Sequence, residues 1–178
     1  MLKTLLFSSM ILLSSISHAG SFTERSAFSG QILQLCSESA LRVMLFNLGD
    51  VALYRQQCNA VPDPLSPPLK LSFVYNRGFT GDEFRKSADE LIRRNVDDAT
   101  YQQIEADLQA FNAGYQDVSA GDRYDIGFSE NAGLVLLKNG TQVSQSDSLE
   151  LAAVYYKIWF GNNPFSGRVK SNLLNGLE

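Results

Sequence analysis

The sequence predicts an α+β protein that is built on a mainly antiparallel sheet. Strand-like and helical segments follow one another as strands, two helices, three strands and two helices. Apolar side chains alternate with period two in the strands and return every three or four positions in the helices. Hairpins connect the later strands, and no regular strand–helix–strand rhythm appears, so a parallel sheet is not expected.

The N-terminal half predicts strands on both sides of a proline-rich loop. Residues 31–56 contain "QILQLC" and "LRVMLFNLGDVALY", two apolar runs with a break near the middle, whereas the polar residues 20–30 are expected to be frayed. Residues 59–68 hold four of the five prolines and predict a stiff extended loop. The following "LKLSFVY" is a half-buried strand, with one face formed by Leu69, Leu71, Phe73 and Tyr75.

Two amphipathic helices are expected next. The first follows Thr80, because Thr80-x-x-Glu83 forms a capping box in which two side chains satisfy free backbone amides. The second spans roughly residues 98–113. Each helix carries one apolar stripe, with which it packs against the sheet or against the other helix.

The C-terminal third predicts a strand, a hairpin and two helices. "DRYDIGF" alternates as a strand, and Asn139-Gly140 favours a type I′ hairpin turn. Asp147-x-x-Glu150 is expected to cap the next helix, which carries Trp159 as a core anchor. That helix is expected to end at Gly161 with a positive φ, because glycine favours this position, and Ser166 caps the last helix.

The first twenty residues, "MLKTLLFSSMILLSSISHAG", predict a signal peptide. Lys3 is followed by a short apolar run and then by the small-residue cleavage site Ser17-His18-Ala19. We therefore expect export to the periplasm, cleavage after Ala19 and a single domain over residues 20–178. An uncleaved anchor is the alternative, although the apolar run is shorter than the roughly 20 residues of a membrane span.

Cleavage would remove His18, the one histidine of the chain, and with it histidine-based triads and metal sites. No cofactor, metal ion or catalytic constellation is expected. The formal net charge of −4 without a basic cluster also argues against nucleic acid as a partner. Cys36 and Cys58 form an even pair in an exported chain and predict one disulfide, with two buried thiols as the alternative.

Five segments together suggest a family. They are "FNLGDVALY", "LKLSFVYNRGFTGDEFRKSADELIRRN", "FNAGYQDVSAGDRYDIGF", "LLKNGTQV" and "YYKIWFGNNPFSGRVKSNLL". In this order they resemble the chalcone isomerase-like family, in its bacterial exported branch, from about residue 31 to the end. The resemblance implies an open-faced β-sandwich: a curved, mainly antiparallel sheet covered by helices, with a cleft between sheet and helices.

The resemblance also bears on activity. The family's enzymes cyclise a chalcone with an Arg and a Thr on neighbouring strands and a Tyr and an Asn on a helix. Those positions fall here on Leu41, Gly49, Phe84 and Leu91. Arg42 lies one residue from the Arg position, and a one-residue shift in a strand turns a side chain to the opposite face. The resemblance therefore implies a protein without isomerase activity.

An apolar cleft is the remaining expectation. Phe84, Leu91 and Tyr54 would line it, and Arg42 would hold a carboxylate at its mouth if the strand is bulged there. The leading hypothesis is a non-catalytic binding module for a fatty acid or a similar apolar ligand. Two alternatives are an enzyme that uses Tyr, Arg and carboxylate groups in the same cleft, and an interaction protein whose cleft is filled by its own side chains.

Overall fold

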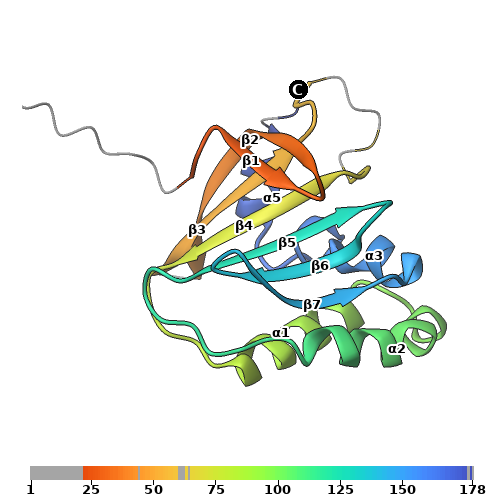
Figure 1. Cartoon of the computed structure of the whole chain (residues 1–178). Helices are drawn as coiled ribbons and strands as arrows, with labels where there is room; N and C mark the ends of the chain where they lie inside the picture. Colours follow the sequence, from red (N-terminus) through yellow and green to blue (C-terminus); the bar gives the residue numbers. More distant parts are fainter. Residues whose placement is uncertain (1–21, 44, 60–62, 64, 176, 178) are drawn as a thin grey trace, which may run out of the picture.

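The computed structural model describes residues 22–43, 45–59, 63, 65–175 and 177, so the expected signal peptide lies outside the described residues. Within them, one antiparallel sheet runs in chain order from β1 to β7 (Figure 1). The strands are β1 Arg25–Phe28, β2 Gln31–Val43, β3 Phe46–Arg55, β4 Leu69–Tyr75, β5 Arg123–Ser129, β6 Gly133–Lys138 and β7 Thr141–Ser146. The helices are α1 Gly81–Arg93, α2 Asp98–Asn112, α3 Leu149–Tyr155, α4 Lys157–Phe160 and α5 Gly167–Asn175.

The helices lie below and behind the sheet in Figure 1, and they cover one of its faces, here called the inner face. The larger core fills the space between them, and its sheet residues include Val51, Leu53, Leu71 and Ile126. This arrangement confirms the predicted α+β class with a curved antiparallel sheet. None of the helices in the described part of the chain has the length and apolar character that a membrane span needs.

The opposite face of the sheet, here called the outer face, carries a second and smaller core. The hairpin of β1 and β2 folds over it, and Phe28, Leu33, Ala52, Tyr54 and Val135 are buried there. The expectation that residues 20–30 are frayed was wrong for β1. The burial of Phe28 and a tight turn through Ser29 and Gly30, both with positive φ, hold this strand against β2.

A β-bulge explains how β2 serves both cores. Leu35 pairs with Tyr54 and Ser37 pairs with Leu53, so Cys36 is an extra residue on β2. A bulge shifts the alternation of a strand by one position and bends it. Leu33 therefore packs in the outer core, whereas Leu41, an even number of residues further on, packs in the inner core.

The predicted disulfide is present between Cys36 and Cys58, with Cα atoms 5.1 Å apart. It joins the bulged part of β2 to the segment that follows β3. The described residues contain no free cysteine.

Most of the expected helix and turn signals are also confirmed. Thr80 and Glu83 form the capping box of α1, and Asn139 and Gly140 turn the β6–β7 hairpin with positive φ. Ser166 accepts a hydrogen bond from Val169 N at the start of α5. The cap of α3 differs, because the Ser148 hydroxyl, and not Asp147, accepts from the amide of Leu151.

Gly161 ends α4 for a different reason from the expected one. Its φ is −68°, so the predicted positive φ was wrong. A Cβ at this position would lie 2.3 Å from Asn95 Oδ1 and 2.6 Å from the carbonyl oxygen of Lys157. Glycine is needed because the end of α1 comes close: Asn95 accepts a hydrogen bond from Asn163 N at 2.8 Å and donates one to Asn163 O at 2.7 Å.

Candidate functional site

A pocket of about 260 Å³ lies between the inner face of the sheet and the helices. We call it the inner pocket. The sheet contributes Leu41, Leu48, Phe73, Tyr75 and Ile126, helix α1 contributes Glu83, Phe84, Ser87, Ala88 and Leu91, and the rest comes from Phe79, Tyr115, Ile158, Trp159 and Phe165. Apolar side chains predominate in the lining. Such a pocket takes the hydrocarbon part of a ligand at little desolvation cost.

Aromatic rings form the wall around Phe84. Its ring stacks on Tyr115, with centroids 5.3 Å apart, and meets Tyr75 and Tyr124 edge-on, each also at 5.3 Å. Phe79 adds a further contact at 5.8 Å. Pairs in these geometries are favourable beyond the area that they bury, so the rings hold one another in place.

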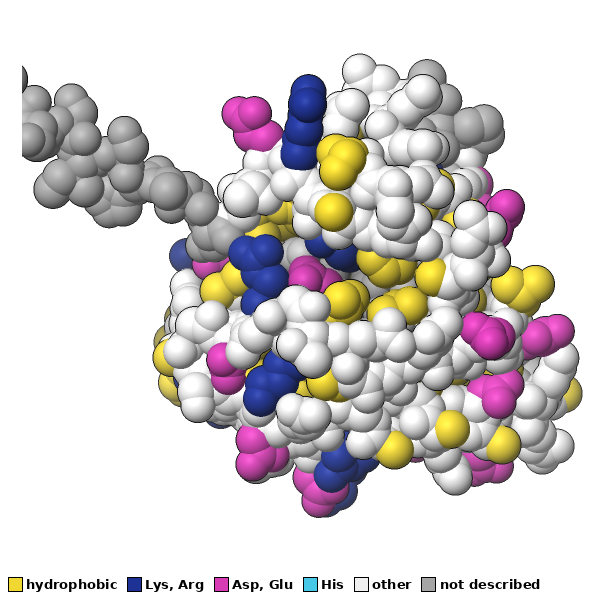
Figure 2. All heavy atoms as spheres, in the orientation of Figure 1, with side chains coloured by type: hydrophobic (Ala, Val, Ile, Leu, Met, Phe, Trp, Pro, Cys, Tyr) yellow, Lys and Arg dark blue, Asp and Glu magenta, His cyan; other side chains and the backbone are white. Residues whose placement is uncertain are grey.

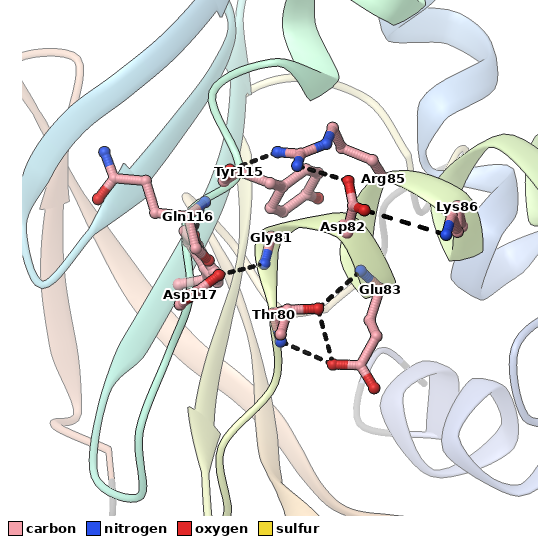
Figure 3. A network of polar contacts seen from close by, with 10 residues as sticks. Thr80, Gly81, Asp82, Glu83, Arg85, Lys86, Tyr115, Gln116 and Asp117 are labelled. Carbon is pink, nitrogen blue, oxygen red and sulfur yellow. Dashed lines mark hydrogen bonds and ion pairs between the residues drawn. The ribbon is translucent and has the colours of Figure 1, made fainter.

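A polar network fixes helix α1 beside the pocket (Figure 3). Asp117 accepts a hydrogen bond from Gly81 N at 2.8 Å, and Arg85 donates to the carbonyl oxygen of Tyr115 at 2.9 Å. Glu83 Oε2 accepts from both the amide and the hydroxyl of Thr80 in the capping box. These bonds join the first turn of α1 to the segment before β5, so Phe84 and Tyr115 approach from two segments that are fixed to each other.

Glu83 is the one carboxylate that lines the inner pocket among the described residues, and the capping box already uses it. Hydrogen bonds from the backbone and the hydroxyl of Thr80 lower the pKa of Glu83. Its carboxylate therefore stays ionised and bonded to the helix start. No arginine or lysine lines the pocket in the described part of the chain.

The tyrosine hydroxyls of the pocket act as hydrogen-bond groups and not as bases. Burial raises the pKa of Tyr75 and of Tyr115 well above the usual value, so both stay protonated. Tyr115 shares a hydrogen bond of 2.9 Å with Tyr155, which donates in turn to Asn112. Among the described tyrosines, Tyr75 alone has a hydroxyl without a hydrogen bond to the protein, which leaves it available to a ligand oxygen.

The structure brings some of the expected site residues together. Phe84 and Leu91 both line the inner pocket from α1, and Leu41 lines it from β2. Gly49 is opposite Leu41 in the sheet. A Cβ at Gly49 would lie 2.1 Å from the carbonyl oxygen of Val74, so this position has no room for the threonine of the family's enzymes.

Tyr54 and Arg42 are not brought to this pocket, which corrects the expectation for both. Tyr54 is buried in the outer core, and its hydroxyl donates to the carbonyl oxygen of Thr23 at 2.8 Å. A bulge does occur beside Arg42, but the extra residue is Leu48 on β3. β2 therefore keeps its alternation there, and Arg42 is exposed on the face opposite to Leu41.

Apart from Phe84, sequence reasoning did not assign the aromatic residues of the pocket to it. The alternation predicts Tyr75 on the buried face of its strand, but it does not predict that the Tyr75 hydroxyl lacks a hydrogen-bond partner in the protein. Tyr115 and Phe165 lie in loops, where no periodicity identifies the direction of a side chain. Trp159, expected as a core anchor, packs at 5.2 Å from Phe73 and also lines the pocket.

Comparison with known proteins gives a matching family model and solved structures of similar fold. A family model described as chalcone isomerase-like matches residues 19–175. The crystal structure of a fatty-acid-binding protein from Arabidopsis thaliana is similar with a TM-score of 0.56 and 13% sequence identity, over 87% of this chain and 92% of that one. At this identity the likeness concerns the fold. No curated protein sequence matches the chain.

Proposed function

Because this chain belongs to the chalcone isomerase-like family, we propose that it is a non-catalytic binding protein whose inner pocket holds a fatty acid or a similar lipid-like ligand. The lining of the pocket carries this proposal: apolar side chains surround it, and its one carboxylate is already bonded to the helix start. The Arabidopsis thaliana protein of similar fold is named as a fatty-acid-binding protein, which agrees with the proposal.

The residues at the enzymatic positions support the part of this proposal that excludes isomerase activity. Cyclisation of a chalcone needs donors aimed at the developing oxyanion, and removing one such donor costs about 3 to 4 kcal/mol of transition-state stabilisation. Leu41 and Gly49 offer no donor from their side chains, and Arg42 is on the opposite face. We therefore expect no isomerase turnover near that of the family's enzymes.

The acyl chain and the head group use different parts of the pocket. Each buried methylene contributes about 0.8 kcal/mol, so a chain of roughly ten supports micromolar affinity after the entropy of immobilisation is subtracted. The Tyr75 hydroxyl is a donor that the protein leaves open for an oxygen of the head group. Phe84 and Leu91 contact the chain.

Calorimetry of the delipidated protein tests the proposal with acids from decanoate to stearate. We expect binding by the wild type, weaker binding by Tyr75→Phe and none by Leu91→Trp, because an indole at position 91 fills the pocket. Leu149→Trp is the matched control, since Leu149 is 60% exposed on α3 and lies outside the pocket. Absence of heat for every chain length would refute the proposal and favour an interaction protein with a filled cleft.

We further propose that the chain is exported to the periplasm, as the bacterial exported branch of the family would be, with a mature domain over residues 20–178. The n-region, the short apolar run and the Ala19 site support this, and so does the Cys36–Cys58 disulfide, since disulfides persist in oxidising compartments. Sequencing the N-terminus of protein recovered from the periplasm tests it. Recovery with Met1 intact would overturn the cleavage.

A further inference from the structure

A second cavity, of about 410 Å³, lies on the outer face of the sheet, and we call it the outer cavity. The β1–β2 hairpin forms one side of it and β4 to β7 the other, so the whole thickness of the sheet separates it from the inner pocket. Figure 2 shows this face, where basic, acidic and apolar side chains gather in a hollow below the hairpin.

The hairpin is held at a fixed height over the sheet. Phe28 lies against Gly127 of β5, and a Cβ at Gly127 would lie 2.3 Å from the Phe28 ring. Ser129 donates a hydrogen bond of 3.0 Å to Ser29 at the turn of the hairpin. The wall of the cavity thus depends on Gly127, because a residue without a side chain leaves room for the Phe28 ring.

Buried charges form the floor of the cavity. The side chain of Lys70 is 4% exposed and that of Asp125 is 9% exposed, with 3.9 Å between Nζ and Oδ1. Lys70 donates to the Ser26 hydroxyl and lies 4.9 Å from the ring centre of Tyr54, and Ser72 donates to Asp125. A buried ion pair often stabilises a fold no more than two well-packed apolar residues do. Stability therefore does not explain why this pair lies at a cavity.

Several hydrogen-bond donors on the lining of this cavity remain open. The Lys70 ammonium has three N–H groups, and within the described residues it makes one hydrogen bond, to Ser26. The Ser26 hydroxyl is an acceptor in that bond, and the Ser29 hydroxyl is an acceptor from Ser129, so the proton of each is open. Asp125, by contrast, already accepts a hydrogen bond from Ser72, and its carboxylate faces Lys70. The cavity therefore offers several open donors beside these acceptors.

We propose that the outer cavity is a second binding site, for a small carboxylate with an apolar body. The carboxylate oxygens accept from Lys70 Nζ and from the hydroxyl of Ser26, which lie side by side. The apolar body lies against Phe28, Val135 and Leu137, which line the same cavity. Asp125 does not exclude an anion, because Lys70 balances its charge and Ser72 donates a hydrogen bond to its carboxylate.

Hexanoate tests this site, and protein carrying Leu91→Trp is used so that the inner pocket is filled. Calorimetry should show hexanoate binding to this protein and at least tenfold weaker binding of hexan-1-ol, which lacks the charge. Ser26→Ala should weaken hexanoate by about tenfold, the effect of one hydrogen bond to a charged group. Leu137→Trp should abolish binding, because it fills the cavity without altering the polar floor.

A further variant separates binding from folding. Lys70→Met with Asp125→Asn removes both charges together, so neither is left buried without its partner. We expect it to lose hexanoate while keeping the near-ultraviolet circular dichroism of the folded protein. No hexanoate binding, or binding that is unchanged in both Ser26→Ala and Leu137→Trp, would overturn the second site. Binding of long-chain acids to Leu137→Trp reports separately on the inner pocket.

Discussion

At the scale of single residues, close contact with neighbouring atoms explains several glycines that look in the sequence like turn or strand-end residues. Gly127 admits the ring of Phe28, and Gly49 lies against the carbonyl oxygen of Val74. Gly161 admits the side chain of Asn95. In each case the missing side chain lets two segments that are distant in the sequence touch, and at Gly161 those segments carry α1 and the loop after α4.

Gly161→Ala should therefore destabilise the fold. The added methyl group has to displace Asn95 Oδ1 or the carbonyl oxygen of Lys157, and overpacking of this kind costs about 1 to 3 kcal/mol. Gly167→Ala is the matched control, because no heavy atom lies within 4 Å of its Cβ position at the start of α5. Urea denaturation measures both. Equal stability of the two variants would contradict the close-approach explanation.

Single residues also show where sequence reasoning succeeds and where it fails. The capping residues Thr80 and Glu83 were predictable because a cap depends on neighbours within one turn. Arg42 and Tyr54 were not, because the face that a strand residue occupies depends on every bulge before it. The extra residue of the bulge beside Arg42 is Leu48 on β3 and not a residue of β2, and nothing in the alternation of either strand predicts this.

At the scale of elements, β2 is the strand that links the two cores. Its first half packs on the outer face with β1, and its second half packs on the inner face, where α5 lies against it. Ser37 donates to the carbonyl oxygen of Leu173 at 2.6 Å, and Asn172 donates to Ser39 at 3.0 Å. The Cys36–Cys58 disulfide is attached at the residue where the strand changes faces.

Removing this disulfide should lower the free energy of unfolding by roughly 3 kcal/mol, because the bond closes a loop between residues 22 positions apart and restricts the unfolded chain. Urea denaturation of Cys36→Ser with Cys58→Ser measures the loss. Wild-type protein in a reductant is the control and should match the double variant. A midpoint that does not move in either sample would show that the bond contributes nothing to stability.

The order of elements was easier to predict than their ends. The strand, helix and hairpin patterns placed β4, α1, α2 and β5 from local periodicity alone. β1 was missed because its four residues gain their stability from Phe28 and from pairing with β2, and neither is visible in a short polar segment. The N-cap of α3 is Ser148, one residue after the predicted Asp147, because both are good capping residues.

At the scale of the whole molecule, the curled sheet has an apolar pocket on one face and a polar cavity on the other. The α+β class was predictable from the apolar strand faces and the amphipathic helices, and the inner pocket was predictable from the resemblance to the family. The outer cavity was not predictable, because Ser26, Lys70 and Asp125 are far apart in the sequence. They come together only because the β1–β2 hairpin folds over β4 and β5 of the same sheet. Long-range contact of this kind leaves no signal in local composition.

The tyrosines give the last prediction, and it involves the entire fold. All seven have a pKa raised by burial as the largest cause, and for Tyr101 it reaches about 12. A folded-state pKa above the unfolded value of about 10 means that the unfolded chain loses these protons first. The resulting stability is complete below about pH 10 and is lost as the pH rises through the folded-state values.

An alkaline titration followed by tyrosinate absorbance and far-ultraviolet circular dichroism tests this coupling. In the folded protein we expect little tyrosinate near pH 10, and then a cooperative rise in absorbance that coincides with unfolding, because the buried phenols ionise once they reach water. Protein in concentrated urea is the control and should titrate at about 10, as exposed tyrosines do. If several tyrosines ionised near that value while the circular dichroism stayed native, the rings around the inner pocket would be open to solvent, and the rigid aromatic wall proposed to hold the ligand would not exist.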